Sequence, residues 1–190
     1  MRVMGVDPSL VRTGWCVLDD GQLVAHGFIT TLAREDMARR LYHINRMIYT
    51  ALLTWQPEYV AIESSEDFQR RLKDGKHSVE SLAAARSAVL IACADLGIEA
   101  KLLNPGHVRW SVCGNLKADK LQVVAALRAH GYELPLMRNG AVDLDVADAV
   151  STAKCCWSEM RLLVRVWQPP TTASEQTSMR RKNGATDADG

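Results

Sequence analysis

The sequence contains no apolar run long enough to cross a membrane. A membrane-spanning helix needs about 20 predominantly apolar residues, and no uninterrupted apolar stretch of that length occurs in the chain of 190 residues. The first residues lead directly into a short strand-like pattern, without the basic region and longer apolar segment of a signal peptide. We therefore expect a cytoplasmic protein that has neither a transmembrane helix nor a secretion signal.

Cysteine pairs and several enzyme motifs are also missing. The five cysteines are odd in number, lie mostly in apolar stretches and include no C-x-x-C pair. This pattern favours reduced thiols in a core over disulfides or a zinc site. The sequence has no H-E-x-x-H zinc motif, no Walker A phosphate loop and no nucleophile motif built on serine or cysteine.

The net charge of +1 is small, but the basic residues are unevenly distributed. Residues 101–138 carry six lysines and arginines against two acids. Residues 64–77 form a second polar and basic segment, which we expect to be a loop or an extension of the next helix. A locally basic surface suits a polyanion such as nucleic acid. The alternative is an ordinary solvated face, which is the usual explanation of a charge cluster.

The hydrophobic pattern predicts an α/β fold. Residues 2–7, 13–19 and 22–30 are expected to form the strands of an antiparallel meander. A helix at 35–55 then precedes a strand at 59–63, and the order strand, helix, strand implies a parallel pair. The remaining expected elements are a helix at 78–96, a strand at 98–104, a turn at Pro105-Gly106, and helices at 107–113, 118–130 and 144–164.

These elements amount to a five-stranded mixed sheet flanked by helices, in one domain over residues 1–166. After Trp167 the chain becomes polar and cannot bury apolar area, so we expect residues 167–190 to be a disordered tail. The helix at 78–96 is apolar on every face from Ala88 onwards. Such a helix needs burial on two sides, against the sheet and against either a second helix or a second subunit.

Two of the predicted strands end in a carboxylate. The first strand ends at Asp7, just before Pro8, and the strand at 59–63 ends at Glu63. Parallel strands place their carboxyl ends at one edge of the sheet, where open α/β sheets bind ligands. We therefore expect Asp7 and Glu63 to lie together. The alternative for Asp7 is a role in the turn, where Asp is common.

Two further acids open the last predicted helix. Asp145 and Asp148 are three residues apart and share a helix face, whereas Asp143 falls off that face and is expected to cap the helix. A simple preference of acids for a helix N-terminus is the alternative. Four carboxylates packed together would repel one another, and two Mg²⁺ ions would remove the conflict. Two such ions can clamp the attacking water and the leaving oxygen of a phosphodiester.

Taken in chain order, these motifs resemble those of RuvC-type Holliday-junction resolvases, which have a ribonuclease H-like fold. The resemblance covers about residues 2–160. The matching segments are Gly5-Val-Asp7-Pro with Thr13-Gly14 for the opening GIDPG…TG motif, Ala61-Ile-Glu63 for the second acid, Asp145-Val-Ala-Asp148-Ala for the closing DAADA motif, and Lys117-Ala-Asp-Lys120-Leu-Gln-Val for the lysine-bearing segment that faces DNA.

The resemblance implies a metal-dependent endonuclease that resolves four-way DNA junctions by paired symmetric nicks, leaving 5′-phosphate and 3′-hydroxyl ends. The catalytic residues, which would also hold two Mg²⁺ ions per active site with Mn²⁺ as a substitute, are Asp7, Glu63, Asp145 and Asp148. The candidate DNA contacts are Lys120, Lys117, Arg109, Phe68, Arg70 and Arg71. The implied partners are four-way or branched DNA, a second copy of the chain in a homodimer that we expect to meet through the helix at 78–96, and a branch-migration helicase if the gene is cellular.

The sequence departs from the family pattern in two places. Ser9 stands where the family usually has Gly, and the segment between Glu63 and Ala85 is longer and more basic. Phe68 is offset by about two residues from the aromatic with which the family wedges open the junction centre, so a surface contact is its alternative role. These departures fit a divergent or phage-encoded member whose substrates extend to forks and other branched DNA.

Other activities remain open at the level of the sequence. A nuclease of the same fold that cuts RNA–DNA hybrids is not excluded. A catalytically inactive junction-binding protein is disfavoured, because four negative charges near phosphates oppose binding. An actin-like ATPase or sugar kinase shares the fold and an opening phosphate turn, but it needs a second repeat of the domain and a second Gly-rich turn, which the chain lacks.

Overall fold

The structure, a computed structural model, describes residues 1–64 and 76–166. Residues Met1–Ser158 form one compact unit, and a second unit starts at Glu159. Phe68, Arg70 and Arg71 lie outside the described residues, as does the tail at 167–190. Their expected roles therefore stay predictions, as does the domain boundary at residue 166.

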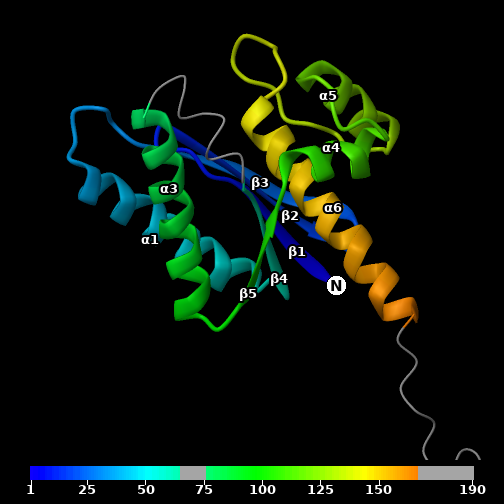
Figure 1. Cartoon of the computed structure of the whole chain (residues 1–190), viewed down its shortest axis with the longest axis horizontal. Helices are drawn as coiled ribbons and strands as arrows, with labels where there is room; N and C mark the ends of the chain where they lie inside the picture. The colour runs from blue at the N-terminus through cyan, green and yellow to red at the C-terminus, as the bar shows by residue number, and fades with distance from the viewer. Residues whose placement is uncertain (65–75, 167–190) are drawn as a thin grey trace, which may run out of the picture. The chain divides into compact units, whose positions relative to one another are not determined.

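Five strands form one mixed sheet in the order β3-β2-β1-β4-β5 (Figure 1). The antiparallel meander consists of β1 (Arg2–Asp7), β2 (Arg12–Asp19) and β3 (Gln22–Thr30). Strands β4 (Tyr59–Glu63) and β5 (Glu99–Leu103) continue the sheet in parallel with β1. The predicted mixed sheet is confirmed, and β1 lies at its centre with an antiparallel neighbour on one side and a parallel neighbour on the other.

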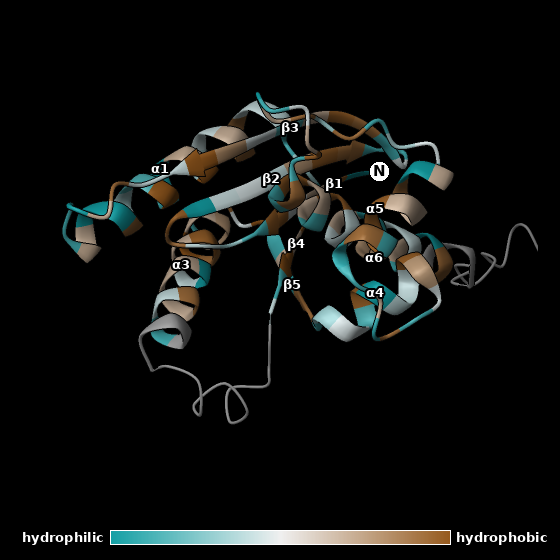
Figure 2. Ribbon diagram, turned by 90° about the horizontal axis from the view of Figure 1, so that it is seen from above, coloured by the Kyte–Doolittle hydropathy of each residue, from teal (hydrophilic) through white to brown (hydrophobic). Residues whose placement is uncertain are grey.

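Helices lie on both sides of the sheet (Figure 2). On one side are α1 (Met37–Trp55) and α3 (Lys76–Asp95). On the other side are α4 (Pro105–Cys113), α5 (Lys120–Ala129) and α6 (Leu144–Val166). The main core lies between the sheet and the first pair of helices. Its largest fully buried members are Met4, Val6, Val17, Ile44, Ile48, Leu52, Val60, Ile62 and Val89.

The second helix that α3 requires is α1, which packs alongside it. Ala88, Val89 and Ala92 are buried there, as the apolar composition of α3 demands. Ile91 nevertheless remains 56% exposed. The prediction of burial on two sides is thus met by the sheet and α1, and a third side of α3 stays apolar and uncovered in the single chain.

One predicted turn is wrong. Pro105 and Gly106 were expected to separate the fifth strand from a helix at 107–113, but they are the first residues of α4. Asn104 caps this helix, because its side-chain oxygen accepts a hydrogen bond from the backbone N–H of Gly106 at 2.8 Å. Proline suits the first helical position because the N–H that it lacks would have no partner within the helix.

None of the five cysteines forms a disulfide, and all five lie within the described residues. Four of the five are buried, in keeping with thiols that belong to the core. Burial raises the pKa of Cys16 to about 12, so this thiol stays protonated and unreactive at neutral pH. Among the described helices, none combines the length and the apolar character that a bilayer crossing requires.

Two glycines allow α6 to lie directly on the sheet. A Cβ atom on Gly5 would stand 2.1 Å from the backbone oxygen of Ala149, and one on Gly14 would stand 2.2 Å from the backbone oxygen of Asp145. Only glycine permits so close an approach of a strand and a helix backbone. The N-terminal turns of α6 are therefore held against β1 and β2, next to the ends of the strands.

Replacing Gly14 with Ala is expected to destabilise the protein by about 1–3 kcal/mol, because the added methyl group forces α6 away from β2. Without the clash the sign would be opposite, since Ala is normally preferred to Gly within a strand. Urea denaturation at fixed protein concentration measures the difference. Thr54→Ala, on the exposed side of α1, serves as a control and should change the free energy of unfolding by less than about 0.5 kcal/mol. An unchanged or increased stability of Gly14→Ala would contradict the close approach.

Candidate active site

Asp7 and Glu63 face the same side of the sheet, towards α6. Alternate residues of a strand share a face, so Asp7 lies on the face of Gly5, which contacts α6. Gly5 pairs with Ala61 in the parallel register of β1 and β4. Glu63, two residues after Ala61, consequently stands beside Asp7 at the carboxyl ends of the two strands. The expected meeting of these two acids is confirmed.

The acids of α6 lie in its first turns. Asp148 is one turn into the helix, and its side chain is 21% exposed. Asp143 precedes the helix and accepts a hydrogen bond from the backbone N–H of Val146 at 3.3 Å. The predicted capping role of Asp143 is confirmed, and it leaves Asp145 and Asp148 as the two acids of α6 that are near the strand ends.

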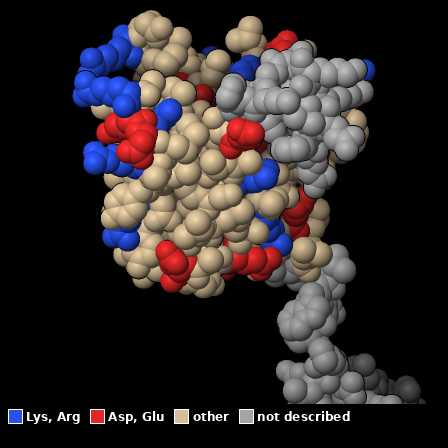
Figure 3. Space-filling model, turned by 60° about the vertical axis from the view of Figure 1, so that its left-hand side comes forward, with Lys and Arg blue, Asp and Glu red and all other residues tan. Residues whose placement is uncertain are grey.

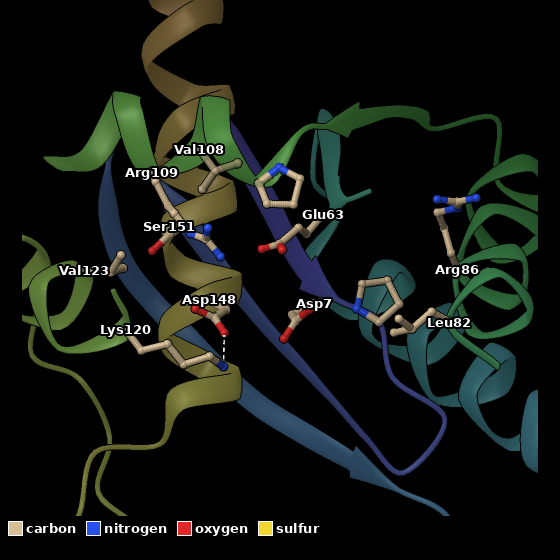
Figure 4. Close-up of a pocket in the computed structure, with 12 residues that line it drawn as sticks. Asp7, Glu63, Leu82, Arg86, Val108, Arg109, Lys120, Val123, Asp148 and Ser151 are labelled. Atoms are coloured by element: carbon tan, nitrogen blue, oxygen red, sulfur yellow. Dashed lines mark hydrogen bonds and ion pairs between the residues drawn. The ribbon is translucent and has the colours of Figure 1, made fainter. Parts of the chain in front are cut away.

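A cleft of about 230 Å³ lies between the strand ends and the helices (Figure 4). Asp7, Glu63 and Asp148 line it together, each from a different element. Three basic side chains also line it, namely Lys120, Arg109 and Arg86. Asp145 is not part of this lining. The cleft thus combines a carboxylate cluster with a surrounding set of cations.

The carboxylate of Asp7 is unfavourable in its ionised form. Burial is the largest cause that raises its pKa from 3.8 to about 8, and the charges of Glu63, Asp148 and Asp145 act in the same direction, in that order. Lys120 lowers this pKa by a smaller amount. At neutral pH and without a cation, Asp7 is therefore held largely in its protonated form.

Asp145 is engaged by Arg12, a residue that no sequence motif singles out. Arg12, on β2, forms ion pairs with both Asp143 and Asp145, and its guanidinium stacks over the ring of Phe28 at 4.0 Å. The hydrogen bond from Arg12 lowers the pKa of Asp143, while that bond raises the pKa of Arg12. A lone arginine between the two halves of the opening motif carries no local signal, because its partners are more than 130 residues away.

The basic residues of the cleft differ in their contacts. Lys120 donates a hydrogen bond to Asp148 at 2.8 Å. Burial lowers the pKa of Lys120, but this hydrogen bond and the neighbouring carboxylates outweigh it, so the pKa is raised overall. Arg86, which sequence reasoning missed, donates to the hydroxyl of Ser64 at 2.7 Å. Of the predicted DNA contacts, Lys120 and Arg109 line the cleft, and Lys117 is exposed on the turn before α5, outside the lining.

The donor set of the cleft fits a hard divalent cation. Mg²⁺ and Mn²⁺ prefer carboxylate oxygens, and Asp7, Glu63 and Asp148 offer them from three rigid elements. Burial and, to a lesser extent, the neighbouring negative charges raise the pKa of Asp7, and a bound cation relieves both effects. Asp145 lies close enough for its charge to act on Asp7 and is a fourth potential ligand.

Comparison with known proteins agrees with this arrangement. The family model of crossover junction endodeoxyribonuclease RuvC matches residues 3–156. A protein of that name from Mycobacterium ulcerans is 33% identical over 163 residues, which cover 83% of this chain and 84% of the relative. Another from Erythrobacter litoralis is 35% identical over 156 residues, which cover 80% and 89%.

Among solved structures, that of Thermus thermophilus RuvC in complex with a Holliday junction substrate superimposes with a TM-score of 0.73 at 23% identity. The match covers 85% of this chain and 96% of the other and supports the fold. The mixed five-stranded sheet and its flanking helices define a protein of the ribonuclease H-like fold class. Within that class, the chain belongs to the family of crossover junction endodeoxyribonuclease RuvC.

The raised pKa of Asp7 makes stability depend on pH when no cation is bound. Asp7 titrates near 8 in the folded protein, against an ordinary value of 3.8. Its proton therefore stabilises the fold fully below about pH 4, and this contribution is lost as the pH rises to about 8. With a chelator present, we expect the free energy of unfolding of the wild type to fall relative to that of Asp7→Asn between pH 5 and pH 8.

Urea denaturation at the two pH values measures this difference. Asp95→Asn, a change at an exposed acid of α3, is the matched control and should follow the wild type. Adding Mg²⁺ at pH 8 should stabilise the wild type more than Asp7→Asn, because the cation binds the ionised carboxylate of the folded protein. Parallel pH curves for wild type and Asp7→Asn would contradict the raised pKa.

Proposed function

We propose that this protein resolves four-way DNA junctions by paired, symmetric, metal-dependent nicks that leave 5′-phosphate and 3′-hydroxyl ends. The observation that carries the proposal is the convergence of Asp7, Glu63 and Asp148 in one cleft that is bordered by Lys120, Arg109 and Arg86. Family membership supports the same activity. The Thermus thermophilus relative forms a complex with a Holliday junction substrate, and we extend this substrate class to the present chain.

The four acids together would bind two Mg²⁺ ions, for which Mn²⁺ can substitute. Asp7 lies near both the strand-end acid Glu63 and the helix acid Asp148, and Asp145 would complete the set of ligands. Two bound ions would supply the charge that activates a water molecule and stabilises the leaving 3′ oxygen. The protein itself contributes fixed carboxylates on rigid elements, which need no reorganisation during the reaction.

The cations at the border of the cleft would hold the DNA backbone. Arg109 and Arg86 face the carboxylate cluster from α4 and α3, and a phosphodiester between them gains charge-assisted hydrogen bonds. Lys120 is paired with Asp148 in the structure. If Asp148 held a cation instead, the ammonium group of Lys120 would be free to contact a phosphate. Phe68, Arg70 and Arg71 stay predicted contacts of the segment between Glu63 and α3.

A homodimer would place two such sites on opposing strands of a junction. An apolar groove of about 400 Å³ lies between α1 and α3 and is lined mainly by Leu41, Tyr42, Ala84, Ala88 and Ile91. Figure 3 shows the side of the molecule that carries these helices, where a broad uncharged surface is bordered by charged groups. This supports the proposal that α3 contributes to the dimer contact. We also propose a cytoplasmic, nucleoid-associated protein, with a branch-migration helicase as partner if the gene is cellular.

The decisive experiment is cleavage of a synthetic four-way junction whose strands are end-labelled in turn, with Mg²⁺, with Mn²⁺ and with chelator. We expect metal-dependent nicks at symmetric positions in two opposing strands. Asp7→Asn should lose more than about a hundredfold in cleavage rate, because a ligand itself matters more than its supporting residues, and it should bind the junction at least as tightly. Asp95→Asn is the matched control and should cut normally.

Three outcomes would change the assignment. Binding without cleavage in either metal would move it to a junction-binding protein, and preferential cleavage of an RNA–DNA hybrid would move it to another nuclease of the fold. Near wild-type cutting by Asp7→Asn would show that Asp7 has only a structural role in the turn. Including forks and three-way junctions as substrates tests the wider branched-DNA range, which strict selectivity for four-way junctions would exclude.

Lys120→Ala is expected to weaken junction binding in a salt-dependent manner. Loss of one phosphate contact lowers the slope of log K against log salt concentration by about one. Binding is measured with Mg²⁺ in the Asp7→Asn background, so that the junction stays intact. Lys101→Ala is the control, since Lys101 pairs with Glu99 on β5 and does not line the cleft. An unchanged slope for Lys120→Ala removes that residue from the DNA interface.

A further inference from the structure

Arg12 divides the acids of the site into two groups. Asp7, Glu63 and Asp148 line the cleft, whereas Asp145 is paired with Arg12 on β2. The same guanidinium also pairs with Asp143, the cap of α6. One of the four proposed ligands is therefore already occupied by a cation that belongs to the protein.

The two carboxylate partners of Arg12 are bound unequally. Asp143 accepts hydrogen bonds from both terminal nitrogens of the guanidinium, with a distance of 2.8 Å between Nη1 and Oδ1. Asp145 accepts a hydrogen bond from Nη1 alone, which also donates to Asp143. The side chain of Asp143 is 6% exposed and that of Asp145 is 34% exposed. Breaking the first pair would leave a buried charge without a partner, which is costly, whereas Asp145 can exchange its partner at the edge of the solvent.

Arg12 itself is held in place independently of Asp145. Its guanidinium stacks on the ring of Phe28 at 4.0 Å, and its side chain is only 23% exposed. A planar guanidinium with a two-pronged carboxylate partner and an aromatic face has little freedom to move away. When Asp145 turns to another cation, the positive charge of Arg12 accordingly remains beside the site and continues to repel that cation.

We propose that Arg12 is a positioning residue that competes with a divalent cation for Asp145 and thereby keeps the second cation of the site weakly bound in the absence of DNA. This inference rests on the proposed function, since it takes Asp145 as a ligand. A phosphodiester in the cleft brings negative charge that offsets Arg12 and shares in binding the cation. The consequence is that full loading with metal is coupled to the arrival of the DNA.

The test is the binding of Mn²⁺ to the full-length, DNA-free protein, measured by isothermal titration calorimetry. Arg12→Gln keeps an amide donor for Asp143 but removes the charge and releases Asp145. We expect the weaker Mn²⁺ ion to bind at least about fivefold more tightly to this variant, the lower end of typical coupling between two ligands. The gain should disappear in Arg12→Gln/Asp145→Asn, because this variant lacks the Asp145 carboxylate for which Arg12 and Mn²⁺ compete.

Arg39→Gln is the matched control. Arg39 is 80% exposed and pairs with Asp36 at the start of α1, so this variant makes the same change in net charge without touching the site and should leave the affinity for Mn²⁺ unchanged. Arg12→Lys is a second variant, which keeps the proposal testable if Arg12→Gln does not fold. A lysine can satisfy buried Asp143 but cannot grip two carboxylates, so it should also tighten binding, by a smaller factor than Arg12→Gln.

Unchanged or weaker Mn²⁺ binding in the folded Arg12 variants overturns the proposal, as does a gain that persists in the Asp145→Asn background. These failures are separate from a failure of the proposed function. A wild-type protein that cuts four-way junctions but whose Arg12→Gln variant shows unaltered Mn²⁺ affinity refutes only the role of Arg12. A wild-type protein that binds no Mn²⁺ and cuts nothing refutes both.

Discussion

Mutual repulsion among carboxylates at the end of β1 is the constraint that governs the surrounding structure. Without a divalent cation, the protein relieves it in three ways. Asp7 is buried and its pKa rises to about 8, so it takes up a proton. Asp148 accepts a hydrogen bond from Lys120, and Asp145 pairs with Arg12. Each device keeps one acid compatible with a folded site, and each can be reversed when a cation binds the same oxygens.

The fold enforces this repulsion by close packing. Gly5 and Gly14 bring the backbone of α6 against β1 and β2, and the parallel register of β1 and β4 sets Glu63 beside Asp7. The acids cannot separate without moving a helix or a strand of the core. Such rigidity is unfavourable for the cation-free protein, but it would preorganise the proposed ligands for metal-assisted hydrolysis. The repulsion among fixed carboxylates thus lowers the stability of the cation-free protein, and the same fixed positions suit the binding of cations.

Local patterns predicted most of the fold. Strands that end in Asp7 and Glu63, and a helix that opens with Asp145 and Asp148, follow from periodicity and from the rule that ligands bind at the carboxyl edge of parallel strands. The capping role of Asp143 follows from its place before the helix. Proline at the start of α4 was misassigned to a turn, because the residue suits both positions and only the cap at Asn104 decides between them.

The partnerships inside the site could not be predicted in the same way. Arg12 meets Asp143 and Asp145 across more than 130 positions of the chain, and the hydrogen bond from Arg86 to Ser64 depends on how α3 approaches β4. Arg12 pairs with the proposed metal ligand Asp145 itself, and Arg86 pairs with Ser64, the residue after the proposed ligand Glu63. From this we infer that the positive charges of the site do not simply attract DNA. They neutralise or orient neighbouring groups first and become available in part when cations and phosphates arrive together. In the proposed mechanism, exchange among these charged partners would set the order in which cations and DNA bind. A sequence motif that contains only the acids omits the basic partners of this exchange.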